Sequence, residues 1–209
     1  MSKKKPASEA VENTPAETND PSLILPPGPV KISKGVISGD SLNGWWEVKA
    51  GNRHFEDSRK SDGLIHQDLR DAFRSLAPHL VLLCDTSEAV KLQKFLKKNR
   101  TFNLLQMPDD ITDDLMNISV SSFSISGQED GQQIVISGSK AIGSKSVNLT
   151  TPKTGYEDIR DPYEFIDELG EAIENCKNEV YKYLFEGKEA MKQLDMFEDV
   201  PEGDLVEMQ

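Results

Sequence analysis

The alternation of apolar and polar residues predicts a sheet followed by helices, and then the same order again. A period of two indicates two strands within residues 30–50 and three more within residues 118–151, with a bulge at Ser121-Ser122 and short glycine-rich links typical of antiparallel hairpins. Apolar residues at helical spacing predict helices over 64–76 and, most clearly, 162–186, and the capping residues Thr86-Ser87-Glu88 predict another over 86–98. The short apolar run 79–85 fits either a buried strand or a turn of helix.

The remaining stretches predict no regular structure. Residues 51–63 are polar and charged and indicate a loop, and residues 99–114 indicate an aspartate-rich connection. The elements together predict one α+β domain over residues 28–187. It has two layers, with a mostly antiparallel five-stranded sheet packed by a long C-terminal helix and one or two shorter helices. Residues 1–27 have the composition of a disordered arm. Residues 188–209, with two lysines against seven acids, predict a flexible acidic tail.

Composition narrows the function classes. The 209 residues carry a formal net charge of −12, which argues against generic binding to nucleic acid or to anionic membranes. No apolar run approaches the roughly 20 residues that span a bilayer, so no membrane partner is expected. The first residues are polar, unlike a secretory signal peptide. Cys84 and Cys176 lie in patterned apolar sequence and indicate reduced, buried thiols, so we expect a cytoplasmic protein.

Catalytic signatures are weak, and we expect a protein that is not an enzyme and needs no cofactor or metal. His54, His66 and His79 lack the spacing of a zinc site, and no phosphate-binding loop or nucleophile elbow is present. The acids of residues 109–114 favour a solvated loop whose carboxylates cap a short helix. A Mg²⁺-dependent nuclease that uses these acids is the alternative reading of the same cluster.

Two features allow a local contact with single-stranded DNA. The end of the helix 86–98 is basic, and its residues are Lys94, Lys97, Lys98 and Arg100. The adjacent Trp45 and Trp46 must point to opposite faces of a strand, so one belongs to the core and the other is available to stack on a base or a partner. The structural alternative for the lysines is that they complement the dipole of their helix.

The acidic tail contains a short motif, Gln193-Leu194-Asp195-Met196-Phe197. It resembles the QL[SD]LF pentapeptide by which bacterial replication proteins bind the sliding clamp, with Met in the fourth position. The resemblance implies that Gln193 hydrogen-bonds at the groove entrance and that Leu194 fills a first pocket. Met196 and Phe197 would fill a deeper apolar pocket, and Asp195 would stay near solvent. The alternative is that Met191, Leu194 and Phe197 continue the last helix as an apolar stripe.

A broader resemblance covers about residues 30–197. The run from Leu64 through 79–85, the pair Thr151-Pro152 and the helical stretch 169–188 are similar to small proteins of tailed phages and prophages that have no defined activity. The resemblance implies a phage protein that acts in the host cytoplasm, and it supplies no catalytic residue.

These features predict a non-enzymatic phage accessory protein of DNA replication or recombination. It would bind a protein partner, with the host sliding clamp as the candidate, and single-stranded DNA. The alternative is a virion-associated or anti-defence interaction protein whose acidic surface mimics DNA. The sequence leaves the oligomeric state open.

Overall fold

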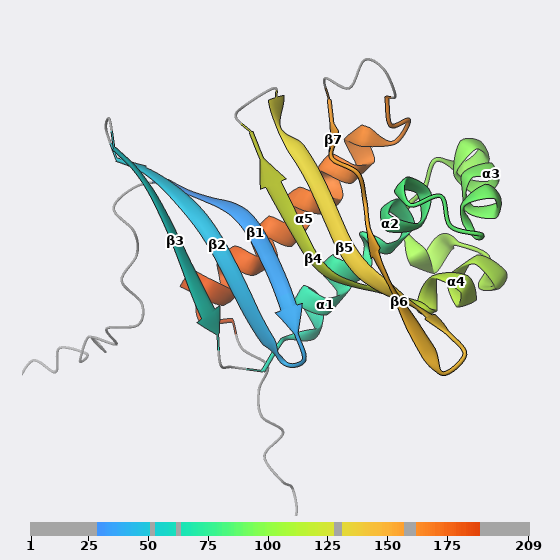
Figure 1. The fold of residues 1–209 in the computed structure, drawn as a ribbon, viewed down its shortest axis with the longest axis horizontal. Coiled ribbons are helices and arrows are strands. Elements are labelled where there is room, and N and C mark those ends of the chain that lie inside the picture. The colour runs from blue at the N-terminus through green and yellow to red at the C-terminus, as the bar shows by residue number, and fades with distance from the viewer. Residues whose placement is uncertain (1–28, 51–52, 62–63, 128–130, 157–161, 189–209) are drawn as a thin grey trace, which may run out of the picture.

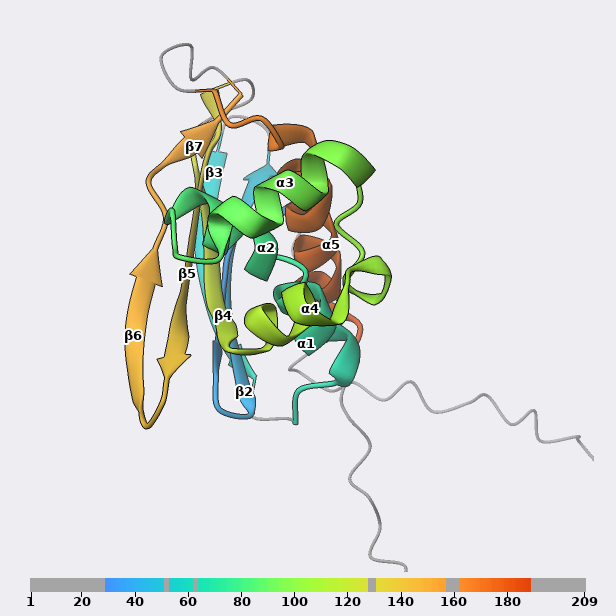
Figure 2. The same cartoon turned by 90° about the vertical axis from the view of Figure 1, so that its right-hand side faces the viewer.

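The computed structural model describes residues 29–50, 53–61, 64–127, 131–156 and 162–188 as a two-layer α+β domain (Figure 1). The strands are β1 (Val30–Ser38), β2 (Ser41–Ala50), β3 (Arg53–Ser61), β4 (Ile118–Ser126), β5 (Gln133–Ile142), β6 (Lys145–Thr150) and β7 (Thr154–Gly155). The helices are α1 (Gln67–Arg74), α2 (Ala77–Leu83), α3 (Ala89–Asn99), α4 (Asp109–Met116) and α5 (Ile166–Phe185), with a 3₁₀ turn at Leu104–Gln106. Figure 2 shows these helices on one side of the sheet.

The sheet is antiparallel throughout, in the order β3-β2-β1-β4-β5-β6, and β7 pairs with β5. The predicted fold class and antiparallel pairing are therefore confirmed, with seven strands in place of five. Two strands carry bulges. The bulge at Ser121 in β4 was expected from the sequence, and a second interrupts the β1–β2 register between Ile32 and Lys34.

The prediction of a loop over residues 51–63 is wrong, because Arg53–Ser61 forms strand β3 along its whole length against β2. Seven of its nine residues are exposed, so no alternation of apolar residues marks it. It forms one edge of the sheet. A charged, polar edge strand is a common device against unwanted pairing with another chain.

The helices correct three further details. The run 79–85, left open between strand and helix, lies mostly in α2. The predicted connection 99–114 contains the 3₁₀ turn and most of α4, which continues to Met116. The helix predicted over 64–76 is α1, which begins at Gln67 after His66, whose Nδ1 accepts a hydrogen bond from the Asp68 amide. The long predicted C-terminal helix is confirmed as α5, although it begins at Ile166.

The core lies between the helical layer and one face of the sheet, and α5 approaches the sheet closely where two glycines face each other. Gly35 of β1 pairs with Gly44 of β2. A Cβ atom at Gly44 would collide with Leu184 of α5, and one at Gly35 would lie 3.1 Å from Val180. The missing side chains therefore set how closely the helix can lie on the strands. The opposite face of the sheet carries no helix among the described residues (Figure 2).

Candidate nucleic-acid interface

The two adjacent tryptophans of β2 divide between the faces of the sheet, as period-two alternation requires. Trp46 is only 7% exposed and meets the ring of Phe185 in α5 edge-on, at 5.0 Å between ring centroids. Trp46 is therefore the core residue of the pair, and it is not available to stack on a base. Trp45 is half-buried and lies on the face without helices, which we call the open face.

Strand pairing assigns the other residues of the open face, because directly opposed residues point to the same side. Trp45 pairs with Ser58 on β3 and with Lys34 on β1, and Lys34 pairs in turn with Ser124 on β4. The same rule assigns further residues to the open face on all six strands from β3 to β6. These are Lys31, Val36, Asn43, Glu47, Lys49, His54, Glu56, Lys60, Ser119, Ser122, Val135, Ser137, Ser139, Asn148 and Thr150.

The bulge in β1 determines that Lys34 belongs to this face. Lys31 pairs with Glu47 and Ile32 with Trp46, so simple alternation would send residue 34 to the core side with Ile32. The extra residue at the bulge shifts the alternation by one, and Lys34 then pairs with Trp45. Its Nζ lies 4.6 Å from the centroid of the Trp45 ring, a cation–π contact.

The charge of the open face differs from that of the whole chain. Its lysines Lys31, Lys34 and Lys49 form no ion pair with an acid among the described residues, and Lys60 adds a fourth positive position. Its acids are Glu47 and Glu56. The rows on β4, β5 and β6 carry mainly serine, asparagine and threonine, which are neutral hydrogen-bonding side chains. The open face is thus basic and polar in a protein whose formal net charge is −12.

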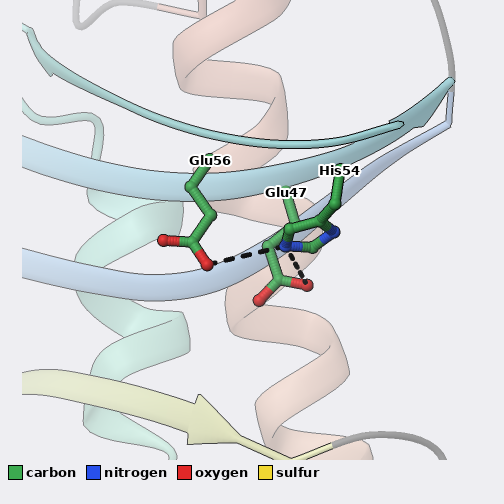
Figure 3. A group of neighbouring side chains, drawn as sticks. All are labelled: Glu47, His54 and Glu56. Carbon is green, nitrogen blue, oxygen red and sulfur yellow. Dashed lines mark ion pairs between the residues drawn. The ribbon is translucent and has the colours of Figure 1, made fainter. Parts of the chain in front are cut away.

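The two acids of the open face meet a histidine at the β2–β3 edge (Figure 3). Glu47 and Glu56 are direct cross-strand partners, and His54 lies two residues before Glu56 on β3. His54 Nε2 is 3.5 Å from Glu56 Oε1 and 3.9 Å from Glu47 Oε2. The side chains of His54 and Glu56 are well exposed, at 45% and 77%, and that of Glu47 is 29% exposed.

The predicted basic patch lies elsewhere. Lys94, Lys97, Lys98 and Arg100 are exposed at the end of α3, at the opposite end of the molecule from β2 (Figure 1). Two of them are paired, since Lys97 Nζ lies 3.4 Å and Arg100 Nη2 3.9 Å from carboxylate oxygens of Glu164. The structure therefore does not bring this patch together with Trp45.

The acids of residues 109–114 lie within helix α4 and not in a loop, and no side chain caps this helix, so they are structural in a different way from the one predicted. Asp109 and Asp110 occupy the first turn of α4, where carboxylates complement the helix dipole. Lys91 Nζ lies 2.9 Å from a carboxylate oxygen of Asp110 and 2.9 Å from one of Asp114. Hydrogen bonds from Lys91 hold the pKa of Asp110 below its usual value. The acids thus bind α4 to α3.

The remaining titratable candidates are structural. Cys84 and Cys176 are free thiols, and burial raises the pKa of both, which is the reverse of an activated nucleophile. His79 is fully buried, stacked at 4.3 Å on Phe102, and its Nδ1 is 2.9 Å from the Tyr163 hydroxyl. Burial lowers the pKa of His79 to about 3, so its ring is neutral at physiological pH.

The residues predicted to bind the clamp, 193–197, lie outside the described residues, as do residues 1–27 of the predicted arm. Helix α5 ends at Phe185, and Gly187 adopts φ 67°, in the left-handed region that commonly ends helices. Lys188 is held by Asp68 and Glu179, with both Nζ–oxygen distances 2.6 Å. The described helix therefore stops before Met191, where the alternative interpretation would have continued it.

None of the helices in the described part of the chain is long and apolar enough to cross a membrane. In comparisons with known proteins, no family model, no curated protein and no solved structure matches this chain.

Proposed function

We propose that this chain is a non-enzymatic accessory protein of DNA replication or recombination, of the phage kind that its sequence resembles, and that it binds single-stranded DNA on the open face of its sheet. One observation carries the proposal. The β1 bulge turns Lys34 onto the open face beside Trp45, and two further lysines of this face, Lys31 and Lys49, form no ion pair among the described residues.

The chemistry of the face suits a single strand. An aromatic ring on an exposed sheet stacks on any base, and neighbouring lysines neutralise phosphates. When a base takes the face of Trp45, Lys34 is free to swing toward a phosphate. The serine and threonine hydroxyls of β4, β5 and β6 supply further hydrogen bonds along the same surface. Most acids of the described residues lie on the helical side, and salt screens charges beyond about 8 Å at physiological ionic strength.

The test is fluorescence anisotropy of a labelled oligothymidylate of about 16 nucleotides, titrated with the full chain at low salt. We expect Trp45→Ala to weaken binding by about 1–3 kcal/mol, about 5- to 150-fold in Kd. Contacts of Lys31, Lys34 and Lys49 with three phosphates should give a slope of about −2 when the logarithm of the association constant is plotted against the logarithm of the salt concentration. Lys34→Ala should bring this slope closer to zero by about 0.7.

The matched control is Lys97→Ala/Lys98→Ala in α3, which removes positive charge from the other end of the molecule. This variant should bind as the wild type does. Wild-type protein that does not bind, or Trp45→Ala protein that binds equally well, would contradict the proposal. Loss of binding in the α3 variant alone would assign the DNA to the patch at Lys94 to Arg100.

We also propose that the tail binds a sliding clamp through Gln193–Phe197. The support is the pentapeptide itself and the end of α5 at Phe185, which leaves the peptide separate from the described helix. Two apolar anchors in an acidic segment suit a concave peptide groove. Purified bacterial clamp should bind the full chain and should not bind the Leu194→Ala/Phe197→Ala variant, measured by calorimetry. Equal binding by both, or by neither, would contradict this part.

The acidic-mimic alternative has its own support in α5. Asp167, Glu171 and Glu174 are exposed along one side of the helix at helical spacing. A basic protein partner would then bind in a salt-sensitive manner, and the interaction would survive deletion of residues 189–209. Retention of such a partner by the deletion variant, with no oligonucleotide binding by the wild type, would favour this function.

A further inference from the structure

We propose that Glu47, His54 and Glu56 form a binding site for one Zn²⁺-class divalent metal ion on the open face. Among the described residues, this is the one group of three histidine, cysteine or acidic side chains whose ligand atoms all lie within 4.8 Å of one another. No metal-ligand spacing around His54 is visible in the sequence, because its partners come from two strands, one of which was expected to be a loop.

The geometry is close to that of a bound ion. Zinc bonds of about 2.0–2.2 Å in a tetrahedron place neighbouring ligand atoms about 3.3–3.6 Å apart. His54 Nε2 already lies 3.5 Å from Glu56 Oε1 and 3.9 Å from Glu47 Oε2. Figure 3 shows the three side chains converging from β2 and β3. Small rotations of two exposed side chains therefore complete the set, while the strand pairing holds the backbone positions.

The donor set selects the class of ion. One imidazole nitrogen with two carboxylates suits Zn²⁺ and similar transition metals, whereas Mg²⁺ and Ca²⁺ prefer oxygen ligands alone. Three protein ligands leave a fourth position for water or for an oxygen of a bound molecule.

The electrostatics of the strands also favour a cation here. Glu47 and Glu56 are directly opposed, and like charges in that position destabilise a sheet. Among the described residues, both carboxylates approach the ring of His54. A divalent metal ion held by the three side chains places two positive charges between the opposed carboxylates and so relieves their repulsion.

Metal binding would change the charge of the open face, a consequence that rests on the proposed function. The two glutamates lie in the same cross-strand row as Lys31, and the row of Trp45 is the next one on the open face. A divalent ion cancels their two negative charges, so Lys31, Lys34 and Lys49 then face no acidic charge on the open face. The DNA affinity of the metal-loaded protein should therefore exceed that of the metal-free protein.

The first experiment observes the histidine ring nitrogens of the full chain by NMR during titration with Zn²⁺. The chain has three histidines, so each ring can be followed. We expect the Nε2 signal of His54 to shift at one equivalent of metal, with His66 and His79 unaffected. No shift at His54, or equal shifts at His54 and His66, would overturn the site. A parallel titration with Mg²⁺ should leave His54 unchanged, and an equal response would overturn the assigned class.

The variants separate the site from the fold. His54→Ala and Glu56→Gln should weaken Zn²⁺ affinity by at least about tenfold in calorimetry, since loss of an outer partner alone costs about 10- to 100-fold. Asp57→Asn is the matched control. Asp57 follows Glu56 on β3 and pairs with Trp46, so strand alternation places it on the opposite side of the sheet from the proposed site. Unchanged affinity in His54→Ala, or equal loss in Asp57→Asn, would overturn the assignment.

The coupling is tested separately. Oligothymidylate affinity is measured with and without Zn²⁺ for the wild type and for Glu56→Gln. A gain in the wild type alone supports the link to DNA, and no gain overturns it while the metal site stands on the NMR result. Absence of DNA binding with and without Zn²⁺ contradicts the proposed function. The metal site is then tested by the NMR titration alone.

Discussion

Adjacent tryptophans on β2 should have opposite effects on stability and on binding. Trp46→Ala removes a side chain that is 7% exposed and that packs on Phe185. Truncation of a buried aromatic residue costs about 3–5 kcal/mol, a large part of the about 5–15 kcal/mol that stabilises a typical domain. For a chain of this size, each kcal/mol shifts Tm by about 2–4 °C, so Tm should fall by about 6–20 °C.

Trp45→Ala removes a half-buried ring on the open face, whose main described partner is the Lys34 ammonium. An exposed cation–π contact contributes about 0.5–1 kcal/mol, so Tm should fall by no more than about 4 °C. Oligonucleotide binding should nevertheless weaken in this variant. Trp46 should therefore matter for stability and Trp45 for binding, because neighbouring residues of a strand point to opposite faces of the sheet.

The assay is thermal unfolding followed by far-UV circular dichroism, with binding measured on the same preparations at a temperature where all are folded. Equal loss of Tm in the two variants would refute the assignment of faces. A Trp46→Ala protein with unchanged Tm would refute the packing of β2 against α5.

Three other perturbations test the fold. Gly35→Ala would place a Cβ 2.8 Å from Phe123 Cε1, and overpacking of this kind should cost about 1–3 kcal/mol in urea unfolding. Burial raises the pKa of Glu88, but its hydrogen bond with Lys140 and other contacts outweigh burial and lower the pKa to about 2. Its stabilising contribution is thus full above pH about 4.5, and the stability gap between wild type and Glu88→Gln should narrow as the pH falls toward about 2. Burial lowers the pKa of His79 to about 3, so wild-type stability should decline as the pH falls from about 6.5, and His79→Gln should lack that component.

Much of the fold follows from local pattern, and the departures have physical reasons. Strands β1, β2, β4 and β5 and the helix α5 each bury one face, so their periodicity is visible in the sequence. Strand β3 is polar on both sides and shows no such signal. The run 79–85 is apolar from Leu80 to Cys84 without a gap, so it has no period to read, and only its packing against the sheet decides that it is helical.

The candidate interface was partly accessible from the sequence. Period-two alternation required that Trp45 and Trp46 separate, but the choice between them depends on where α5 lies. Lys34 was hidden by the bulge, which reverses the face that alternation assigns to it. The spacing of His54 and Glu56 places both on one face of a strand, a signal that becomes readable only once β3 is recognised. The basic end of α3 was visible, but its distance from Trp45 is a property of the tertiary fold.

The central claim, that the open face binds single-stranded DNA, is tested most directly by the indole N–H signals of the two tryptophans. The chain has two tryptophans, so an NMR titration with oligothymidylate reports on both faces of β2 at once. We predict that the Trp45 indole signal moves together with the amides of Lys31 and Lys34, while the Trp46 indole and the amides of α3 stay in place. Changes confined to α3, with the Trp45 indole unmoved at saturation, would contradict the account.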